Sequence, residues 1–143
     1  MSEVIIRPYH ADDYLQVQAF WERNGLGEAE RGDKALIVAK TLAAGGHLLV
    51  MTTASGVIMG SAWLTNDKRR TYLHHFGIDK PYRHKGYATR LLKACLELAV
   101  KDGYQIKVEV HRSNSISLHL FRKAGFEYLG DYEVHIARDI NKL

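Results

Sequence analysis

The sequence predicts one domain of mixed α/β (α+β) class, with a mostly antiparallel sheet of six to seven strands flanked by about four helices. The chain has 143 residues, the usual length of one domain, so residues 1–143 are expected to fold together. Runs with strand and helix periodicity follow the order β-α-α-β-β-β-α-β-α-β-β. Only residues 71–110 show a strand–helix–strand pattern, which predicts one parallel pair among antiparallel strands.

The first third of the chain is predicted to contain one strand and two helices. Residues 4–8 alternate weakly and predict the strand. Asp12 or Asp13 can cap the helix that follows, because a short side-chain oxygen accepts hydrogen bonds from the free amides at a helix start. Asp33 is the corresponding candidate cap for the second helix.

The middle of the chain predicts a hairpin, a strand, a helix and a further strand. Residues 47–51 and 57–65 are β-rich runs separated by a turn, and residues 71–78 predict the next strand. Residues 86–102 predict the best-formed helix, because their apolar side chains fall on one continuous face. That face consists of Ala88, Leu91, Leu92, Cys95, Leu96 and Ala99. Residues 105–110 alternate apolar and polar side chains, which predicts a strand with two distinct faces.

The last quarter of the chain is predicted to contain a helix and two short strands. The helix covers about residues 115–124, and Gly125 ends it because glycine adopts the left-handed conformation at little cost. The two strands are expected within residues 126–139, on either side of Gly130.

Composition excludes several classes of protein. Hydrophobic residues make up 46% and charged residues 25% of the chain, which is typical of a globular protein. Cys95 is the single cysteine, so a disulfide framework and a cysteine-rich zinc site are excluded; on its apolar stripe it is expected to serve core packing. No apolar run approaches the ~20 residues of a membrane span, and the first residues do not resemble a secretory signal. We therefore expect a cytoplasmic protein with no membrane partner.

The histidines do not form a recognisable metal site. There are eight of them, but no His-x-x-x-His pattern with an acid occurs. His74 and His75 are adjacent in a predicted strand and should point to opposite faces. No metal is expected.

Positive charge is concentrated in residues 68–90. The whole chain carries a formal net charge of +4, and this stretch contains seven basic residues against one acid, Asp79. The basic residues are Lys68, Arg69, Arg70, Lys80, Arg83, Lys85 and Arg90. Such a cluster is either a solvated face or a site for phosphate or nucleic acid.

The sharpest signal is the junction before the best-formed helix, Tyr82-Arg83-His84-Lys85-Gly86-Tyr87-Ala88-Thr89-Arg90. A helix start offers free amides and the positive end of the dipole, which together attract an anion. The small residues Gly86 and Ala88 allow close approach to the backbone, and the surrounding basic side chains and Thr89 add charge and a hydroxyl. The arrangement suits a pyrophosphate.

With two features downstream, this junction resembles the GNAT superfamily of N-acetyltransferases. The family pattern is [Gln/Arg]-x-x-Gly-x-[Gly/Ala] opening a helix, then a strand, an asparagine and Leu-[Tyr/Phe]-x-x-x-Gly-Phe. Here these are Arg83 to Ala88, Asn114, and Leu120 to Phe126, in the same order. The resemblance covers about residues 71–130. Within the family, the chain resembles the ribosomal-protein alanine acetyltransferase-like members and the members that acetylate small-molecule amines.

The resemblance implies binding of acetyl-CoA between two central parallel strands that splay apart. Its pantetheine arm would lie beside Phe76, Gly77 and Ile78, with the amide of Phe76 or Gly77 donating to the thioester oxygen. The residues expected at its phosphates are Arg83, His84, Lys85, Gly86, Tyr87, Ala88 and Thr89. The resemblance also places Asn114, Phe121 and Lys123 among the cofactor-binding residues.

The implied reaction is direct attack of a primary amine on the thioester in a ternary complex. Because an alkyl ammonium has a pKa of about 10.4, a base must remove its proton. Glu109 is the first candidate base, and His75 is an alternative, as are His74 and His111. Where many members carry a tyrosine as general acid this chain has Phe121, so water or Tyr132 would have to serve.

The implied acceptor site lies near residues 20–35 and 128–135. The residues expected to contact the amine are Trp21, Glu22 and Glu28, because acids and an aromatic ring suit a cation. The acceptor is a small-molecule, peptide or protein amine, and the protein is expected to be a monomer or homodimer. A non-catalytic acyl-CoA-binding sensor is the alternative; a nucleic-acid binder is disfavoured because exposed aromatic residues do not interleave with the basic ones.

Overall fold

The computed structural model describes residues 3–27 and 32–142. The chain divides into two compact units, residues 1–109 and residues 110–143. Among the described residues, the first unit holds the sheet and three α-helices, and the second holds one further α-helix.

The first unit is a five-stranded sheet in the order β1-β2-β3-β4-β5. Its strands are β1 Val4–Pro8, β2 His47–Thr53, β3 Ile58–Asn66, β4 Arg70–Ile78 and β5 Gln105–Val108. The first four strands pair antiparallel and β5 pairs parallel to β4, as the strand–helix–strand pattern predicted. The mixed α/β class is confirmed.

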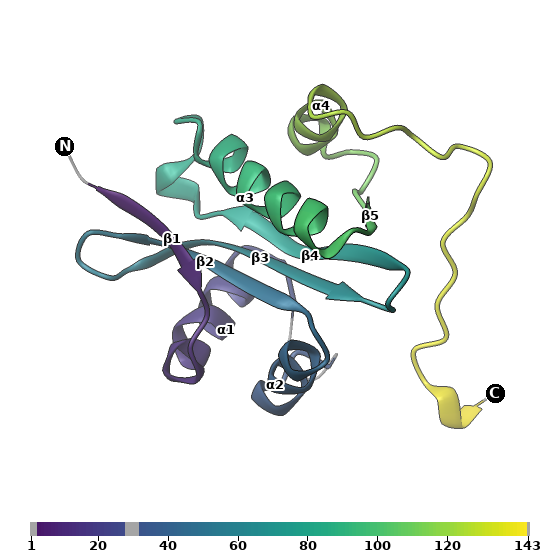
Figure 1. Cartoon of the computed structure of the whole chain (residues 1–143), viewed down its shortest axis with the longest axis horizontal. Helices are drawn as coiled ribbons and strands as arrows, with labels where there is room; N and C mark the ends of the chain where they lie inside the picture. Colours follow the sequence, from purple (N-terminus) through teal and green to yellow (C-terminus); the bar gives the residue numbers. More distant parts are fainter. Residues whose placement is uncertain (1–2, 28–31, 143) are drawn as a thin grey trace. The chain divides into compact units, whose positions relative to one another are not determined.

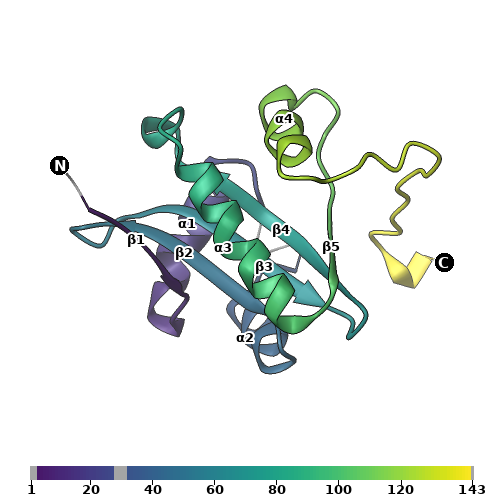
Figure 2. The ribbon, with the colours of Figure 1, turned by 45° about the horizontal axis from the view of Figure 1, so that its top comes forward.

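Helices cover both faces of this sheet (Figures 1 and 2). The helices α1 (Tyr14–Arg23) and α2 (Ala35–Ala43) lie on one face, and α3 (Tyr87–Asp102) lies on the other. All three were predicted from periodicity. The structure does not form the predicted side-chain caps. The Asp13 carboxylate accepts a hydrogen bond from the N–H of His10, and α2 begins after Lys34 without a side-chain cap.

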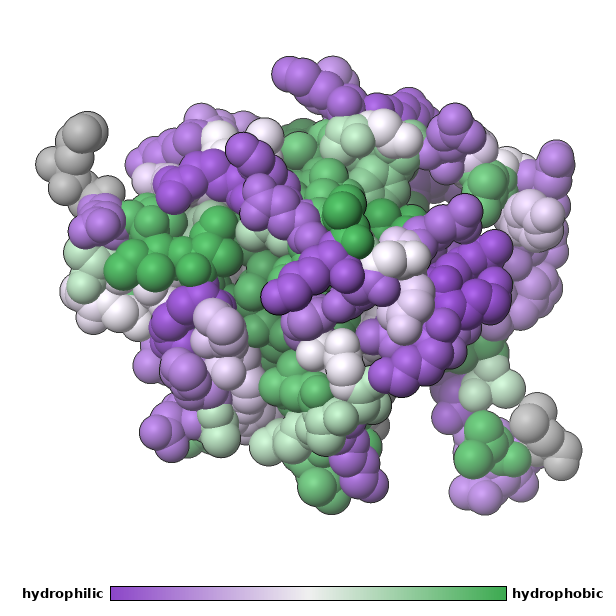
Figure 3. All heavy atoms as spheres, in the orientation of Figure 1, coloured by the Kyte–Doolittle hydropathy of each residue, from purple (hydrophilic) through white to green (hydrophobic). Residues whose placement is uncertain are grey.

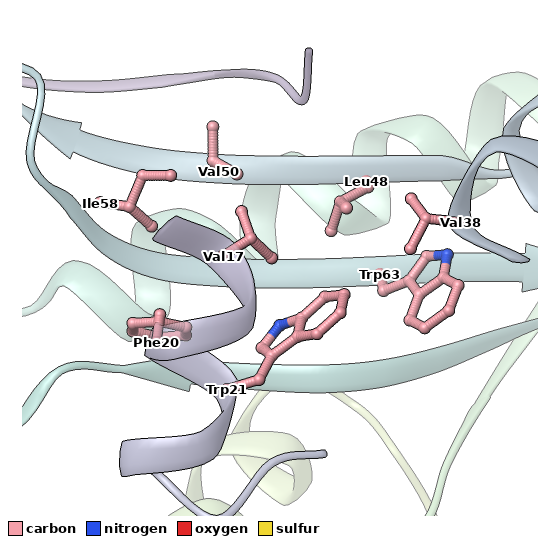
Figure 4. Close-up of a cluster of buried hydrophobic side chains, with 8 residues drawn as sticks. All are labelled: Val17, Phe20, Trp21, Val38, Leu48, Val50, Ile58 and Trp63. Atoms are coloured by element: carbon pink, nitrogen blue, oxygen red, sulfur yellow. The ribbon is translucent and has the colours of Figure 1, made fainter. Parts of the chain in front are cut away.

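The sheet face beneath α1 and α2 carries a compact hydrophobic cluster. Figure 4 shows its members, Val17, Phe20, Trp21, Val38, Leu48, Val50, Ile58 and Trp63. The indoles of Trp21 and Trp63 stack with their centroids 5.4 Å apart. The burial of these rings fixes α1 against β3.

The helix α3 follows directly from its sequence. Its buried side chains are Leu91, Leu92, Cys95 and Ala99, which lie on the predicted apolar face. Gly86 precedes it and Gly103 ends it, both with φ at +84°. Burial raises the pKa of the Cys95 thiol to about 12, so this residue is packed as an apolar group, as expected.

A β-bulge interrupts the pairing of β3 with β4. Ser61 pairs with Gly77 and Trp63 pairs with His74, so two residues of β4 stand opposite one residue of β3. The first of the two, His75, has φ at +46°. The rings of His74 and His75 therefore both lie beside Trp63, with centroids 6.2 and 5.3 Å away. The prediction that they point to opposite faces was wrong, because it assumed an unbroken strand.

The second unit contains less regular structure than the sequence predicted. The helix α4 (Ser115–Lys123) is present, but in the described residues that follow it the only regular element is η4 (Ile140–Lys142). The two strands predicted within 126–139 are absent there, and β5 ends at Val108, before the predicted Val110. The expected six to seven strands are therefore five in the part of the chain described.

The missing strands have a physical explanation. Tyr132, Val134 and Ile136 alternate as a strand would, but they are between 71% and 78% exposed. A strand forms when a neighbouring strand supplies hydrogen bonds and its apolar face is buried. Neither condition follows from alternation alone.

Hydrophilic and hydrophobic residues are interspersed on the face drawn in Figure 3. Across residues 3–27 and 32–142, none of the helices has the length and apolar character that crossing a bilayer requires.

Candidate functional site

The end of β4 leads through a short loop into α3. The loop contains the 3-10 turn η3 (Lys80–Tyr82), after which His84 has φ at +63° and Gly86 has φ at +84°. Within the described part of the chain, the backbone N–H groups of residues 84–89 donate no hydrogen bond. Residues in left-handed conformation beside a helix start turn successive amides to the same side, which creates a concavity for an anion.

We call residues 83–89 the phosphate loop, and space is open beside its backbone. A Cβ atom built on Gly86 would meet no heavy atom within 4 Å. The side chains of His84, Lys85 and Thr89 are exposed. The predicted pyrophosphate position thus combines free backbone amides, open space and the exposed positive charge of Lys85.

The side chain of Arg83 holds the phosphate loop in place. Its Nε donates to the carbonyl oxygen of Ile78 at 2.8 Å, and one terminal nitrogen donates to Asn24 Oδ1 at 3.0 Å. One of the backbone groups expected to face pantetheine, the carbonyl of Ile78, is therefore already engaged. The arginine of the motif acts on the loop geometry through these two bonds.

The carboxylate of Asp79 ties the same loop to the end of α1. It accepts from Arg23 at 2.7 Å and from the side-chain amide of Asn24 at 3.1 Å. The hydrogen bond from Arg23 is the main reason that the pKa of Asp79 is lowered from its usual value. The loop that leaves α1 and the phosphate loop thus share one polar network.

The parallel strands β4 and β5 are paired over only four residues. Arg70 to Leu73 pair with Gln105 to Val108, after which β5 ends while β4 continues to Ile78. The expected splaying of the central strands is consistent with this early end. Glu109, the residue after β5, is exposed.

His74 lies where the two strands part. Its Nε2 is 2.8 Å from Thr65 Oγ1. His74 keeps an exposed surface, but desolvation by neighbouring protein atoms lowers its pKa, and the charge of His75 lowers it further. The negative charges of Glu109 and Asp33 oppose this shift. Glu109 and His74 are therefore electrostatic neighbours.

His75 is held by contacts on its backbone and its ring. Ser61 Oγ donates to the carbonyl of His75 at 2.7 Å and accepts from Trp21 Nε1 at 2.9 Å. The ring packs edge-on against Trp21, with centroids 4.8 Å apart, and its Nε2 lies 3.0 Å from Asp33 Oδ2. A histidine, a carboxylate and a buried serine thus meet at the bulge.

The predicted acceptor residues occupy different environments. Trp21 is only 1% exposed, and its ring packs against the rings of Trp63 and His75. Glu22 is exposed on α1. Glu28 lies outside the described residues.

Five predicted site residues belong to the second unit, and one of them, the alternative base His111, has its Nδ1 2.7 Å from Ser113 Oγ. Asn114 caps α4, because its Oδ1 accepts from the N–H of Ser117 at 3.1 Å. Phe121 is buried and packs edge-on against Phe126 at 5.2 Å, while Lys123 and Tyr132 are exposed.

Sequence reasoning missed Asp33 and Ser61 as partners of His75. Asp33 was considered only as a helix cap and as part of an acidic region, and Ser61 stood inside an apolar run. A buried polar residue in such a run is a signal, since it needs a partner. In the described ranges, no group of three or more His, Cys, Asp or Glu is placed to hold a metal ion.

Known proteins resemble this chain in sequence and in fold. A sequence model of the acetyltransferase (GNAT) family matches residues 10–126. A mycothiol acetyltransferase of Clavibacter sepedonicus is 30% identical over 119 residues, which are 81% of this chain and 39% of that protein. The chain thus spans about two fifths of the length of the mycothiol acetyltransferases that it matches.

Two solved structures illustrate the likeness of fold. An aminoglycoside N-acetyltransferase in complex with CoA aligns with a TM-score of 0.74 and 18% identity, covering 98% of this chain and 97% of that one. The ribosomal-protein-S18-alanine N-acetyltransferase from Escherichia coli aligns with a TM-score of 0.73 and 17% identity, covering 87% and 78%. At these identities the alignments establish the fold.

Proposed function

Since the chain belongs to the acetyltransferase (GNAT) family, we propose that it is an acetyl-CoA-dependent N-acetyltransferase that acts on a primary amine by direct attack in a ternary complex. The match confirms the family that the motifs resemble, and the structural alignments confirm the fold expected from it. The related proteins are named for small-molecule acceptors and for a ribosomal protein, so the acceptor is proposed to be an amine of one of these classes.

The phosphate loop is the observation that carries the proposal. Its amides at residues 84–89 have no partner within the described chain, and Gly86 leaves open space beside them. A diphosphate accepts several hydrogen bonds and carries the negative charge that a helix start favours. Arg83, His84, Lys85, Tyr87, Ala88 and Thr89 complete the proposed phosphate site.

The pantetheine arm is proposed to run along β4 beyond the last pair with β5. Phe76, Gly77 and Ile78 lie on this part of β4. The amide of Phe76 or Gly77 would donate to the thioester oxygen, which gains negative charge as the amine attacks. Asn114, Phe121 and Lys123, in the second unit, remain proposed cofactor contacts.

The ammonium form of the acceptor must lose one proton before it can attack, and the nitrogen loses a second proton as the amide forms. The amine lone pair forms the C–N bond, the C–S bond breaks, and the thiolate of CoA leaves; a thiol pKa of about 8.5 makes it a tolerable leaving group. Glu109 and His75 are the proposed bases, because one directly follows β5 and the other lies at the bulge of β4. With Phe121 at the usual tyrosine position, water or Tyr132 would protonate the thiolate.

Release of free thiol from acetyl-CoA in the presence of a panel of amines tests the proposal. The panel should contain an aminoglycoside, a peptide with N-terminal alanine and simple alkyl amines. Amine-dependent thiol release together with an acetylated product supports an N-acetyltransferase. Tight binding of acetyl-CoA without release for any amine would contradict it and favour a non-catalytic acyl-CoA sensor.

A further inference from the structure

The ring of His75 lies beside a carboxylate that the fold has turned toward it. His75 Nε2 is 3.0 Å from Asp33 Oδ2, and the two side chains are only 18% and 11% exposed. The approach is not aligned as a hydrogen bond, and Nε2 has no other partner among the described residues. A carboxylate at this distance favours the imidazole tautomer with its proton on Nε2, which leaves Nδ1 as the acceptor.

Asp33 is not used for the helix that it precedes. The N-cap of α2 is Lys34, and no side chain caps that helix. The backbone carbonyl of Asp33 accepts from the hydroxyl of Tyr14 at 2.7 Å, which anchors the residue while its carboxylate faces His75. A buried carboxylate is costly unless a partner compensates it, so this placement needs the histidine.

Two glycines, Gly27 and Gly77, allow Leu26 and Asp33 to lie close to β4. A Cβ on Gly27 would overlap the carboxylate of Asp33 and come within 2.5 Å of His75 Nε2. A Cβ on Gly77 would come within 2.9 Å of the Leu26 side chain. The contact between loop and bulge is thus built into the backbone on both sides.

The backbone of His75 is fixed as well. Its φ of +46° is costly for a residue other than glycine, and Ser61 holds its carbonyl oxygen. The bulge brings the ring to the face that carries Trp21 and Trp63. Residues with strained backbone conformations cluster at functional sites, where a bulge can set the direction of a side chain.

From this geometry we infer that Asp33 is a positioning residue, which orients the ring of His75 so that Nδ1 accepts the proton released by the attacking amine. The inference rests on the proposed acetyltransferase function, and it selects His75 rather than Glu109 as the base. The proton passes from the amine nitrogen to Nδ1 as the C–N bond forms, and the carboxylate of Asp33 stabilises the imidazolium. Two other titratable groups interact with this pair: His74, on β4, and Tyr14, on α1; the charge of Glu109, after β5, acts on His74.

The substitution Asp33→Asn tests the inference because it removes the charge and keeps the shape. We expect kcat to fall at least tenfold, with the KM for acetyl-CoA unchanged within twofold. Asp33→Glu, which restores the charge, should recover part of the lost turnover.

A second histidine–aspartate pair provides the matched control. His47 Nε2 lies 2.9 Å from Asp102 Oδ2, between the start of β2 and the end of α3. Asp102→Asn should leave kcat unchanged. Thermal unfolding of each variant identifies any that is not folded.

The tautomer of His75 gives a readout that does not depend on turnover. Long-range ¹H–¹⁵N spectra of the full chain should show the proton of His75 on Nε2, and the Nδ1–H form should appear in Asp33→Asn. An Nδ1–H tautomer in the unmodified protein, or Asp33→Asn turnover within twofold of the unmodified protein, would overturn the inference. The expected tautomer without thiol release for any amine would instead overturn the proposed function.

Discussion

Arg83 and Asn24, which are 59 residues apart in sequence, are joined by a hydrogen bond of 3.0 Å between guanidinium and amide oxygen. The same guanidinium donates to the carbonyl of Ile78, and Asn24 also donates to Asp79. The end of α1, the end of β4 and the phosphate loop are therefore parts of one network. Substitution of any residue in this network should change the geometry of the phosphate loop.

Replacement of Arg83 by lysine should weaken CoA binding. An ammonium group cannot donate from two fixed positions to Ile78 and Asn24 as a guanidinium does. We expect the Kd for CoA, measured by calorimetry, to rise at least fivefold, with a stability loss of about 1 kcal/mol. Arg69→Lys, at an exposed arginine, is the control; equal affinity in both variants would show that the network does not shape the loop.

Substitutions of the two glycines at the ends of α3 distinguish the effect of backbone strain from a loss of ligand binding. Gly86 and Gly103 share a φ of +84° and both have open space at the Cβ position. Substitution of either by glutamate should cost about 1–2 kcal/mol of stability, because an L-residue is strained there. Only Gly86→Glu should abolish CoA binding, by placing a carboxylate at the phosphate position. Retained affinity in that variant would argue against the phosphate loop.

The bonds from Trp21 to Ser61 and from Ser61 to His75 should stabilise the bulge. Ser61→Ala leaves the buried Trp21 Nε1–H without an acceptor, which should cost about 1–3 kcal/mol in denaturant unfolding. Ser55→Ala, at an exposed serine, should cost less than about 0.5 kcal/mol. In the double variant with Trp21→Phe, the loss should be smaller than the sum of the single losses. Strict additivity would mean that the two side chains act independently.

His74 should make stability depend on pH in a definite direction. Its pKa is lowered in the folded protein, so between that value and about 6.5 the unfolded chain binds more protons. Its contribution to stability is therefore complete above about pH 6.5 and is lost as the pH falls toward the folded pKa. Urea unfolding at several pH values should show this slope, and His74→Gln should reduce it; an unchanged slope would exclude His74 as its source.

The charge of Glu109 opposes the lowered pKa of His74. Glu109→Gln should therefore lower the pKa of His74 further, as measured by NMR titration of the ring. Glu97→Gln, an exposed glutamate on α3, should leave that pKa unchanged. If Glu109→Gln has no effect, the two side chains are not neighbours in solution, and Glu109 loses support as a group at the parting of the strands.

The sequence by itself determined the elements whose causes are local. The helix α3 follows from its apolar stripe and its two glycines, and the phosphate loop follows from free amides that every helix start possesses. The order of elements through α4 was predicted for the same reason. The family resemblance depended on these local features.

Only the tertiary structure decided the features that need a partner distant in the chain. The bulge that turns His75 beside His74 arises from pairing with β3, and alternation in one strand cannot reveal it. Asp33 meets His75 only in the folded chain, where the ring of His75 packs against Trp21 on α1. Residues 126–139 alternate like strands yet form none, because a strand requires a neighbour and a buried face.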